Sequence, residues 1–232
     1  MLNDQPATAR ALPERVTAVL LDLDGTVSRS GDVIAASMLQ TCAELGLPPF
    51  DVSRMTEFIG PPVRSNLATL ARVPEHLLDE ATVRYRAIYR TRAHQAPPYP
   101  GMVDAVRALH AAGIPLAVAT SKAVDVAHLV VDHLDIAELF TTVQGSREAD
   151  QWSTPKGDVV ALALAALREA GVDVSAAVMV GDRHHDVDGA ADHGLPTVFV
   201  TWGYGRADEA AGAAAVVGSA DQLLRVLGVS HE

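Results

Sequence analysis

The chain has 232 residues, of which 49% are apolar and 20% charged, and its formal net charge of −11 disfavours nucleic acids as partners, since binding to their backbones needs clustered Lys and Arg. Its single cysteine, Cys42, excludes an internal disulfide and indicates a reducing compartment. No apolar stretch approaches the roughly 20 residues of a membrane span, and residues 1–15 are interpreted as a polar, flexible tail without a signal-peptide core. We therefore expect a packed globular protein of the cytoplasm with no membrane or nucleic-acid partner.

The first predicted element is a short buried strand at residues 16–21, which is followed by the sequence Asp22-Leu-Asp24-Gly25. Gly25 permits a tight turn and close approach of the backbone to a ligand. In open α/β sheets, ligands bind beyond the carboxyl ends of the strands. We therefore expect Asp22 and Asp24 to face one crevice, although the same stretch taken alone is also typical of an ordinary Asp-Gly turn.

The next region, up to about Ala96, has apolar residues at helical spacing and no convincing strand. Pro61-Pro62 is typical of a helix start. The predicted helices lie near residues 34–45, 52–59, 63–70 and 77–88. The Pro- and Gly-rich stretch at residues 97–101 ends this region. The pattern predicts an all-helical cap domain at residues 29–97.

Strands and helices alternate from Gly101 onward. Predicted strands lie at residues 114–119, 140–143, 177–180, 197–200 and 214–217. Predicted helices lie at residues 102–112, 124–133, 156–170, 186–193 and 221–227. Such alternation indicates right-handed βαβ units with helices on both faces of a parallel sheet. The predicted fold class is therefore α/β, with a Rossmann-like core formed by residues 16–28 and 98–232.

Polar side chains follow three of the predicted strands. Asp22 and Asp24 follow the first, Thr120 and Ser121 a middle strand, and Asp182 a later one, with Asp186 one turn further on. Because the carboxyl ends of parallel strands share one edge of a sheet, these groups are expected to converge. Four carboxylates repel one another unless a cation lies among them, and oxygen ligands suit Mg²⁺. Hydroxyl groups and a lysine in the same crevice would add donors for a phosphate.

These segments resemble, in order and in placement, the four motifs of the haloacid dehalogenase superfamily. The matching segments are Asp22-Leu-Asp24-Gly25-Thr26-Val27, Thr120-Ser121-Lys122, Lys156 and Gly181-Asp182-Arg-His-His-Asp186. The helical insertion after the first motif resembles the cap of phosphoglycolate phosphatases and β-phosphoglucomutases. The resemblance implies an enzyme that acts on a small phosphorylated metabolite.

The resemblance also implies a role for each site residue. Asp22 would be the nucleophile that forms an aspartyl-phosphate, and Asp24 the general acid and base. Mg²⁺ would be bound by Asp22, the backbone carbonyl of Asp24 and Asp182, with Asp186 either a ligand or a partner of the ligands. The expected phosphate-binding residues are Thr120, Ser121 and Lys156.

Alternatives remain open for several of these residues. Thr120 and Ser121 could instead cap the following helix. Members of this superfamily often have a proline after the lysine that Lys156 resembles, whereas here Gly157 follows it. Lys122 is therefore a rival phosphate-binding residue. Asp186 could be an acid favoured by the start of a helix.

Three other functions use related residues. A phospho-acceptor receiver domain would place an aspartate on a middle strand, and a dehalogenase would need neither Asp24 nor a metal. A phosphomutase would share the whole core, so the sequence does not separate it from a hydrolase. Gly60 and Arg64 are expected in a substrate-facing part of the cap, where Arg64 could meet a carboxylate or a second phosphate. Phosphoglycolate is the first substrate hypothesis, and a nucleoside monophosphate is the main competitor.

Overall fold

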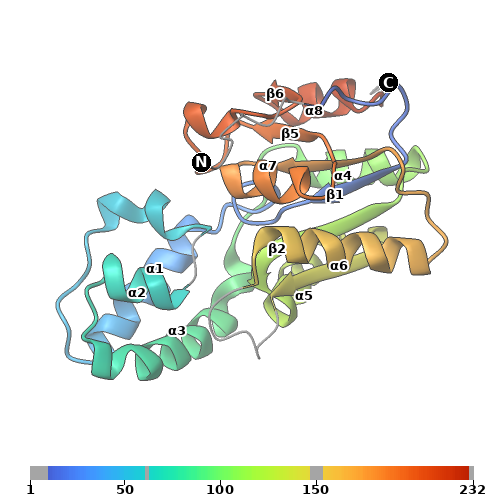
Figure 1. Ribbon diagram of the computed structural model, residues 1–232. Helices are drawn as coiled ribbons and strands as arrows, with labels where there is room; N and C mark the ends of the chain where they lie inside the picture. The colour runs from blue at the N-terminus through green and yellow to red at the C-terminus, as the bar shows by residue number, and fades with distance from the viewer. Residues whose placement is uncertain (1–9, 61–62, 147–153, 230–232) are drawn as a thin grey trace.

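In the computed structural model, which describes residues 10–60, 63–146 and 154–229, six strands form one all-parallel sheet (Figure 1). The strand order is β3-β2-β1-β4-β5-β6. The strands are β1 (Ala18–Leu21), β2 (Leu116–Ala123), β3 (Thr142–Ser146), β4 (Ala177–Gly181), β5 (Thr197–Val200) and β6 (Ala215–Val217). The predicted α/β class with a parallel sheet is therefore confirmed.

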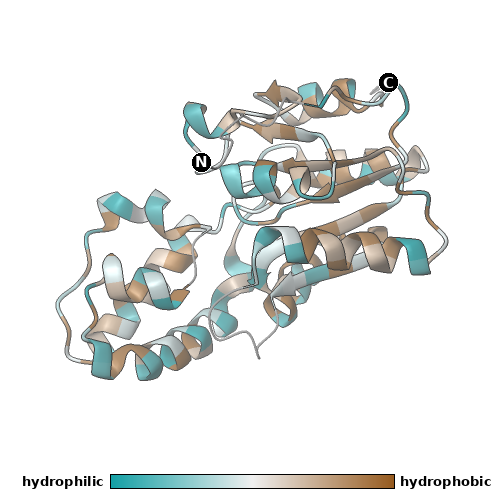
Figure 2. Ribbon diagram, viewed as in Figure 1, coloured by the Kyte–Doolittle hydropathy of each residue, from teal (hydrophilic) through white to brown (hydrophobic). Residues whose placement is uncertain are grey.

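Helices cover both faces of this sheet. One face packs against α4 (Met102–Ala111), α5 (Val124–His133) and α8 (Ala220–Val226), and the other packs against α6 (Lys156–Glu169) and α7 (His184–Ala191). Strand β1 supplies both cores, since Val19 and Leu21 belong to the first and Ala18 and Leu20 to the second. All four of these side chains are fully buried. Figure 2 shows the strands as the most consistently hydrophobic part of the fold.

The described residues between β1 and α4 contain helices and no strand. They form α1 (Gly31–Glu44), α2 (Val63–Thr69) and α3 (Leu78–Arg92), with short 3-10 helices at Val52–Phe58, Glu75–Leu77 and Ala93–Gln95. In Figure 1 this insertion is a separate lobe beside the carboxyl ends of the strands. The second predicted helix is thus a 3-10 helix, and the predicted start of the third at Pro61-Pro62 lies outside the described residues.

Two chain segments connect the insertion to the core, and they run side by side. The amide of Arg29 donates to the carbonyl of Pro97 at 2.8 Å, and the amide of Tyr99 donates to the carbonyl of Val27 at 2.9 Å. These bonds fall beside the predicted limits of the cap at residues 29 and 97. The limits themselves stay a prediction.

The sequence-based boundary of β2 differs from the observed one in a way that affects the site. The strand was expected to end at Ala119, but it continues to Ala123 and contains Thr120, Ser121 and Lys122. After an irregularity in its pairing with β3, Ala123 pairs with Ser146. Gly145 permits this, because a Cβ at that position would lie only 2.4 Å from the carbonyl oxygen of Lys122.

No helix in the described parts of the chain has the length and apolarity needed to cross a bilayer.

Replacing Leu20 by alanine should lower the free energy of unfolding by about 2–5 kcal/mol, because Leu20 is fully buried in the central strand and its loss leaves a cavity. Val83→Ala is the control, since Val83 is 68% exposed on α3 and should change stability by less than about 0.5 kcal/mol. Urea unfolding of both variants measures the difference. Equal effects of the two substitutions would contradict the described core.

Candidate active site

The strand order reverses between β1 and β4, and polar residues follow both strands. Asp22 comes directly after β1, and Asp182 directly after β4. In open α/β sheets the crevice at such a reversal is where ligands bind. Asp186, in the first turn of α7, joins them, and carboxylate oxygens of all three residues lie within 4.8 Å of one another. All three side chains are buried.

Lys156, the first residue of α6, lies against this cluster. Its Nζ is 2.7 Å from Oδ1 of Asp22 and 2.6 Å from Oδ1 of Asp186. The Lys156 side chain is itself buried, so its ammonium is enclosed with the carboxylates. The predicted nucleophile therefore has Lys156, and not its rival Lys122, as its ammonium partner.

The electrostatics of this cluster follow from its burial. Burial raises the pKa of Asp22 to about 6, although the Lys156 ammonium acts in the opposite direction. Burial and the neighbouring Asp186 and Asp22 carboxylates raise the pKa of Asp182 well above its ordinary value. Burial acts to lower the pKa of Lys156, but attraction to Asp186 and Asp22 outweighs it and the pKa is raised. The three carboxylates and one ammonium leave two formal negative charges, which a divalent cation would neutralise.

Backbone atoms of two other chain segments lie very close to the Asp182 carboxylate. The amide of Tyr204 donates to Oδ2 of Asp182 at 2.7 Å. Gly25, with φ of +90°, and Gly203 both lie so close that an added Cβ would come within 2.2 and 2.3 Å of Oδ2 of Asp182. Side chains at either glycine would displace this carboxylate. The turn at Gly25 after β1 therefore packs directly against the carboxylate of Asp182, which follows β4.

The sequence left Asp186 as either a member of the metal site or an acid at the start of a helix, and its two contacts agree with both. Its Oδ1 pairs with Lys156, while its Oδ2 accepts a hydrogen bond from the amide of Arg183 at 3.0 Å. The second contact satisfies a backbone donor at the start of α7. Asp186 therefore supports the helix and belongs to the acidic cluster.

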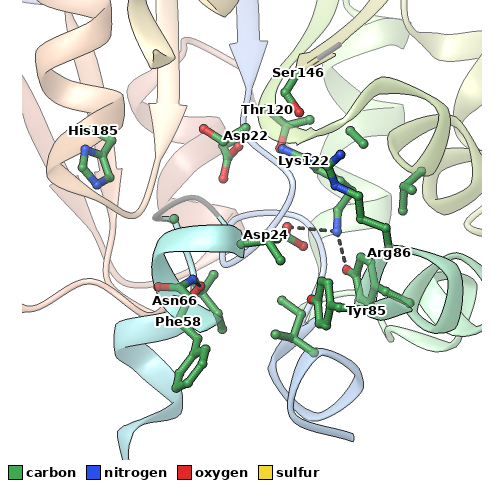
Figure 3. Close-up of a pocket in the computed structure, with 18 of the residues that line it drawn as sticks. Asp22, Asp24, Phe58, Asn66, Tyr85, Arg86, Thr120, Lys122, Ser146 and His185 are labelled. Atoms are coloured by element: carbon green, nitrogen blue, oxygen red, sulfur yellow. Dashed lines mark hydrogen bonds and ion pairs between the residues drawn. The ribbon is translucent and has the colours of Figure 1, made fainter. Parts of the chain in front are cut away.

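Asp24 lies beside the cluster with a different ammonium. Its Oδ2 is 2.9 Å from Nζ of Lys122, a contact that a dashed line marks in Figure 3. Lys122 also donates to the hydroxyl of Tyr89. The other oxygen, Oδ1 of Asp24, is buried and has no hydrogen-bond partner in the described structure. The first-motif aspartates are thus held by two different lysines.

Thr120 and Ser121 lie near the carboxyl end of β2, the strand that pairs with β1. Thr120 is buried, and its hydroxyl accepts a hydrogen bond from the amide of Lys122 at 3.3 Å. Helix α5 begins at Val124, and the residue before it, Ala123, has no side chain that could cap it. The helix-capping alternative for Thr120 and Ser121 is therefore not what the structure contains. Both residues line the same cavity as Asp22 and Asp24.

This cavity, with a volume of about 160 Å³, lies between the edge of the sheet and the insertion (Figure 3). The insertion supplies a largely apolar wall, whose residues include Ile34, Met38, Phe58, Ile59, Tyr85 and Tyr89. Gly60 and Arg64 also line the cavity. The Arg64 guanidinium pairs at 3.0 Å with Glu75 and with Asp79, two exposed carboxylates of the insertion. Arg64 is thus already engaged with acidic side chains.

Three contributors to the site were not predicted from the sequence. Tyr89 reaches Lys122 from α3, and the Tyr204 amide holds Asp182. The Arg183 guanidinium joins core and insertion, because it donates to the carbonyl of Ile59 and pairs with Glu209 at 2.8 Å. For Tyr204, the sequence indicates only that it follows a predicted strand near the site edge of the sheet. Its position does not predict that its backbone amide binds Asp182.

Comparisons with known proteins agree with this architecture. The family of haloacid dehalogenase-like hydrolases matches residues 19–200. The protein named tyrosine-protein kinase PtkA from Mycobacterium tuberculosis is 40% identical over 191 residues, which span 82% of this chain but only 64% of PtkA. A phosphoglycolate phosphatase from Agrobacterium fabrum is 30% identical over 191 residues, or 80% of each protein. A crystal structure described as a predicted phosphatase from Clostridium acetobutylicum matches with a TM-score of 0.80 and 29% identity, covering 91% of this chain and 98% of that one. The chain therefore belongs to the haloacid dehalogenase-like hydrolase family.

Proposed function

We propose that the protein is a Mg²⁺-dependent phosphomonoester hydrolase that acts on a small phosphorylated metabolite through an aspartyl-phosphate. One observation carries this proposal: three buried carboxylates lie together at the reversal of the sheet, and a buried lysine pairs with two of them. Such a cluster is costly to bury unless a cation neutralises it, and the Lys156 ammonium beside that cation would attract an anion. A metal-bound phosphate ester is the simplest ligand that supplies both charges.

The donor set fits Mg²⁺ because it consists of oxygen atoms with uncompensated negative charge. Asp22 and Asp182 would hold the ion with their carboxylates and Asp24 with its backbone carbonyl, while Asp186 would bind it directly or orient the others. When bound, Mg²⁺ neutralises negative charge on the phosphoryl group and on Asp22.

The reaction uses side chains that are close together in the cavity. The Asp22 carboxylate attacks phosphorus, the bond from phosphorus to the ester oxygen breaks, and Asp24 gives its proton to the departing oxygen. A water molecule then loses a proton to Asp24 and attacks the phosphorus, which breaks the bond to Asp22 and releases phosphate. Thr120, Ser121 and Lys156 would hold the phosphoryl oxygens during both steps.

Phosphoglycolate is the first substrate candidate, supported by the similarity to the Agrobacterium fabrum enzyme. Gly60 and Arg64 would then face the substrate, although Arg64 would have to exchange one of its acidic partners for the carboxylate. The apolar wall with Phe58 and Tyr85 favours a second candidate, a nucleoside monophosphate. A panel of phosphorylated metabolites separates the two, and a requirement for a sugar bisphosphate would instead reveal a phosphomutase.

The similarity to a protein named as a tyrosine kinase is a reason to test for kinase activity as well. If the phosphoryl group is transferred to tyrosine and not to water, incubation with ATP and a tyrosine-containing peptide should give phosphotyrosine. A hydrolase should release free phosphate from a phosphomonoester and leave the peptide unlabelled. The chain spans 64% of that relative, so the kinase activity of the longer protein is a separate hypothesis here.

EDTA should abolish phosphomonoester hydrolysis, and excess Mg²⁺ should restore it, because two negative charges of the cluster are otherwise uncompensated. Ca²⁺ should bind but inhibit, since its larger and looser coordination shell misplaces the nucleophile. Phosphate release from p-nitrophenyl phosphate measures both effects. Full activity in metal-free buffer would end the proposal.

Replacing Asp182 by asparagine should stabilise the metal-free protein at neutral pH. Because the pKa of Asp182 is raised in the folded state, its ionisation disfavours folding progressively as the pH rises above the unfolded value of about 4. The advantage of Asp182→Asn in EDTA should therefore be absent near pH 4 and grow toward pH 7. Mg²⁺ should raise the unfolding temperature of the wild type more than that of the variant.

Thermal unfolding with and without Mg²⁺ measures these shifts. Asp132→Asn is the control, since Asp132 is an exposed carboxylate on α5 outside the acidic cluster and its variant should respond to Mg²⁺ as the wild type does. Equal stabilisation of the wild type and Asp182→Asn by Mg²⁺ would remove Asp182 from the metal site.

The two aspartates of the first motif should be separable by their variants. Asp22→Asn removes the nucleophile and should abolish turnover of every substrate. Asp24→Asn leaves the backbone carbonyl in place and should reduce turnover by about 10²–10⁴-fold. Steady-state rates on one substrate measure both. Residual turnover that is greater in Asp22→Asn than in Asp24→Asn would reverse the assigned roles.

A further inference from the structure

We propose that Lys122 is a positioning residue that fixes the carboxylate of Asp24 for proton transfer, and that Tyr89 of the insertion fixes Lys122 in turn. The inference rests on the proposed function, since it assigns a task to residues around the general acid and base. It replaces the alternative in which Lys122 binds the phosphoryl group.

Lys122 is a buried ammonium with two partners from different parts of the chain. Its Nζ is 2.9 Å from Oδ2 of Asp24, which follows β1, and donates to the hydroxyl of Tyr89 on α3. The ammonium also lies 4.6 Å from the centre of the Tyr89 ring. With only 3% of its side chain exposed, Lys122 cannot exchange these partners for water without a large cost.

This contact makes the two oxygens of Asp24 unequal. Oδ2 is held by the Lys122 ammonium, whereas Oδ1 is buried and has no hydrogen-bond partner among the described residues. An unpaired buried acceptor is costly unless a ligand satisfies it. Oδ1 is therefore the atom left to exchange a proton with the departing ester oxygen and with water.

The geometry also separates the tasks of the two lysines. Lys156 pairs with Asp22 and Asp186 and so lies where the phosphoryl group is transferred. Lys122 pairs with Asp24, on the side of the site that the insertion covers. Because Tyr89 belongs to the insertion, the Lys122 ammonium is fully held only while α3 keeps Tyr89 within reach of it. Proton transfer by Asp24 is thereby linked to the placement of the insertion.

A series of aryl phosphates tests this assignment, because proton donation matters more as the leaving group becomes poorer. Lys122→Met should lower kcat/KM for phenyl phosphate, which reports the step that expels the leaving group, by about 10²-fold, the order of loss expected when a reacting group is misplaced by about 1 Å. The loss for p-nitrophenyl phosphate, whose leaving group needs no proton, should be several-fold smaller, and its KM should change little. Tyr89→Phe should show the same dependence on the leaving group with a smaller loss.

Thr82→Val is the matched control, since Thr82 carries another buried hydroxyl of α3, donates to the carbonyl of Leu78 at 2.7 Å and does not line the cavity. The hydrogen bond from Lys122 goes to Tyr89, so Thr82→Val should leave the ratio of the two rates as in the wild type. A changed ratio in Thr82→Val equal to that in Tyr89→Phe would overturn the role of the Tyr89 hydroxyl.

Other outcomes identify which claim has failed. A uniform loss across the series in Lys122→Met, with raised KM and weaker inhibition by inorganic phosphate, would show that Lys122 binds the phosphoryl group and would overturn the inference alone. A uniform loss that tracks a lowered unfolding temperature would reduce Lys122 to a structural residue and overturn it as well. If the wild type lacks Mg²⁺-dependent hydrolysis of every aryl phosphate, the proposed function fails and the inference fails with it.

Discussion

The site depends on a cluster of carboxylates that the fold holds close together and buries away from water. Asp22, Asp182 and Asp186 are held within reach of one another by the ends of β1 and β4 and the first turn of α7. A single ammonium, that of Lys156, offsets part of their repulsion. Burying such a set is unfavourable in the absence of a cation, so the α/β core supplies stability that the site itself lacks.

The glycines and the loop after β5 maintain this arrangement. Gly25 and Gly203 leave room for the Asp182 carboxylate, and the Tyr204 amide fixes one of its oxygens. The Tyr204 hydroxyl accepts a hydrogen bond from the amide of Gly31 at 2.7 Å, at the entrance to the insertion. The same loop therefore touches the acidic cluster and one connection to the insertion. A movement of this connection would therefore displace the loop that contacts the acidic cluster, and a movement of the cluster would displace the connection.

The insertion meets the core on two sides of the cavity. Arg183 links the start of α7 to the carbonyl of Ile59, and Tyr89 links α3 to Lys122 in β2. Between these contacts lies the apolar wall that faces Asp22 and Asp24. The core thus holds the carboxylates and both lysines, while the insertion adds apolar side chains and the guanidinium groups of Arg64, Arg86 and Arg90 to the cavity lining.

The parts of the site that could be predicted from the sequence are those with a local signal. A buried apolar run that ends in a carboxylate marks Asp22 and Asp182, because strand ends of a parallel sheet converge. The helical spacing of apolar residues likewise predicts the helix near residues 77–88, which includes Tyr85. It gives no indication that the hydroxyl of Tyr89, one turn further along, reaches a lysine of the core.

The remaining features depend on contacts between distant segments. The end of β2 was misplaced because Thr120 to Lys122 have the composition of a loop, whereas pairing with β3 near Gly145 extends the strand. The pairing of Lys156 with Asp22 and of Lys122 with Asp24 likewise follows from tertiary geometry alone. Sequence spacing left these two lysines as rivals, while their distances to the aspartates distinguish them.

The most direct measurement is rapid-quench labelling with ³²P-labelled p-nitrophenyl phosphate, followed by mass-spectrometric mapping of the labelled peptide. The account predicts a Mg²⁺-dependent, acid-stable and hydroxylamine-sensitive label on Asp22 that appears at a rate compatible with turnover and is absent from Asp22→Asn. Label on any other residue, or label that persists in Asp22→Asn, would contradict it.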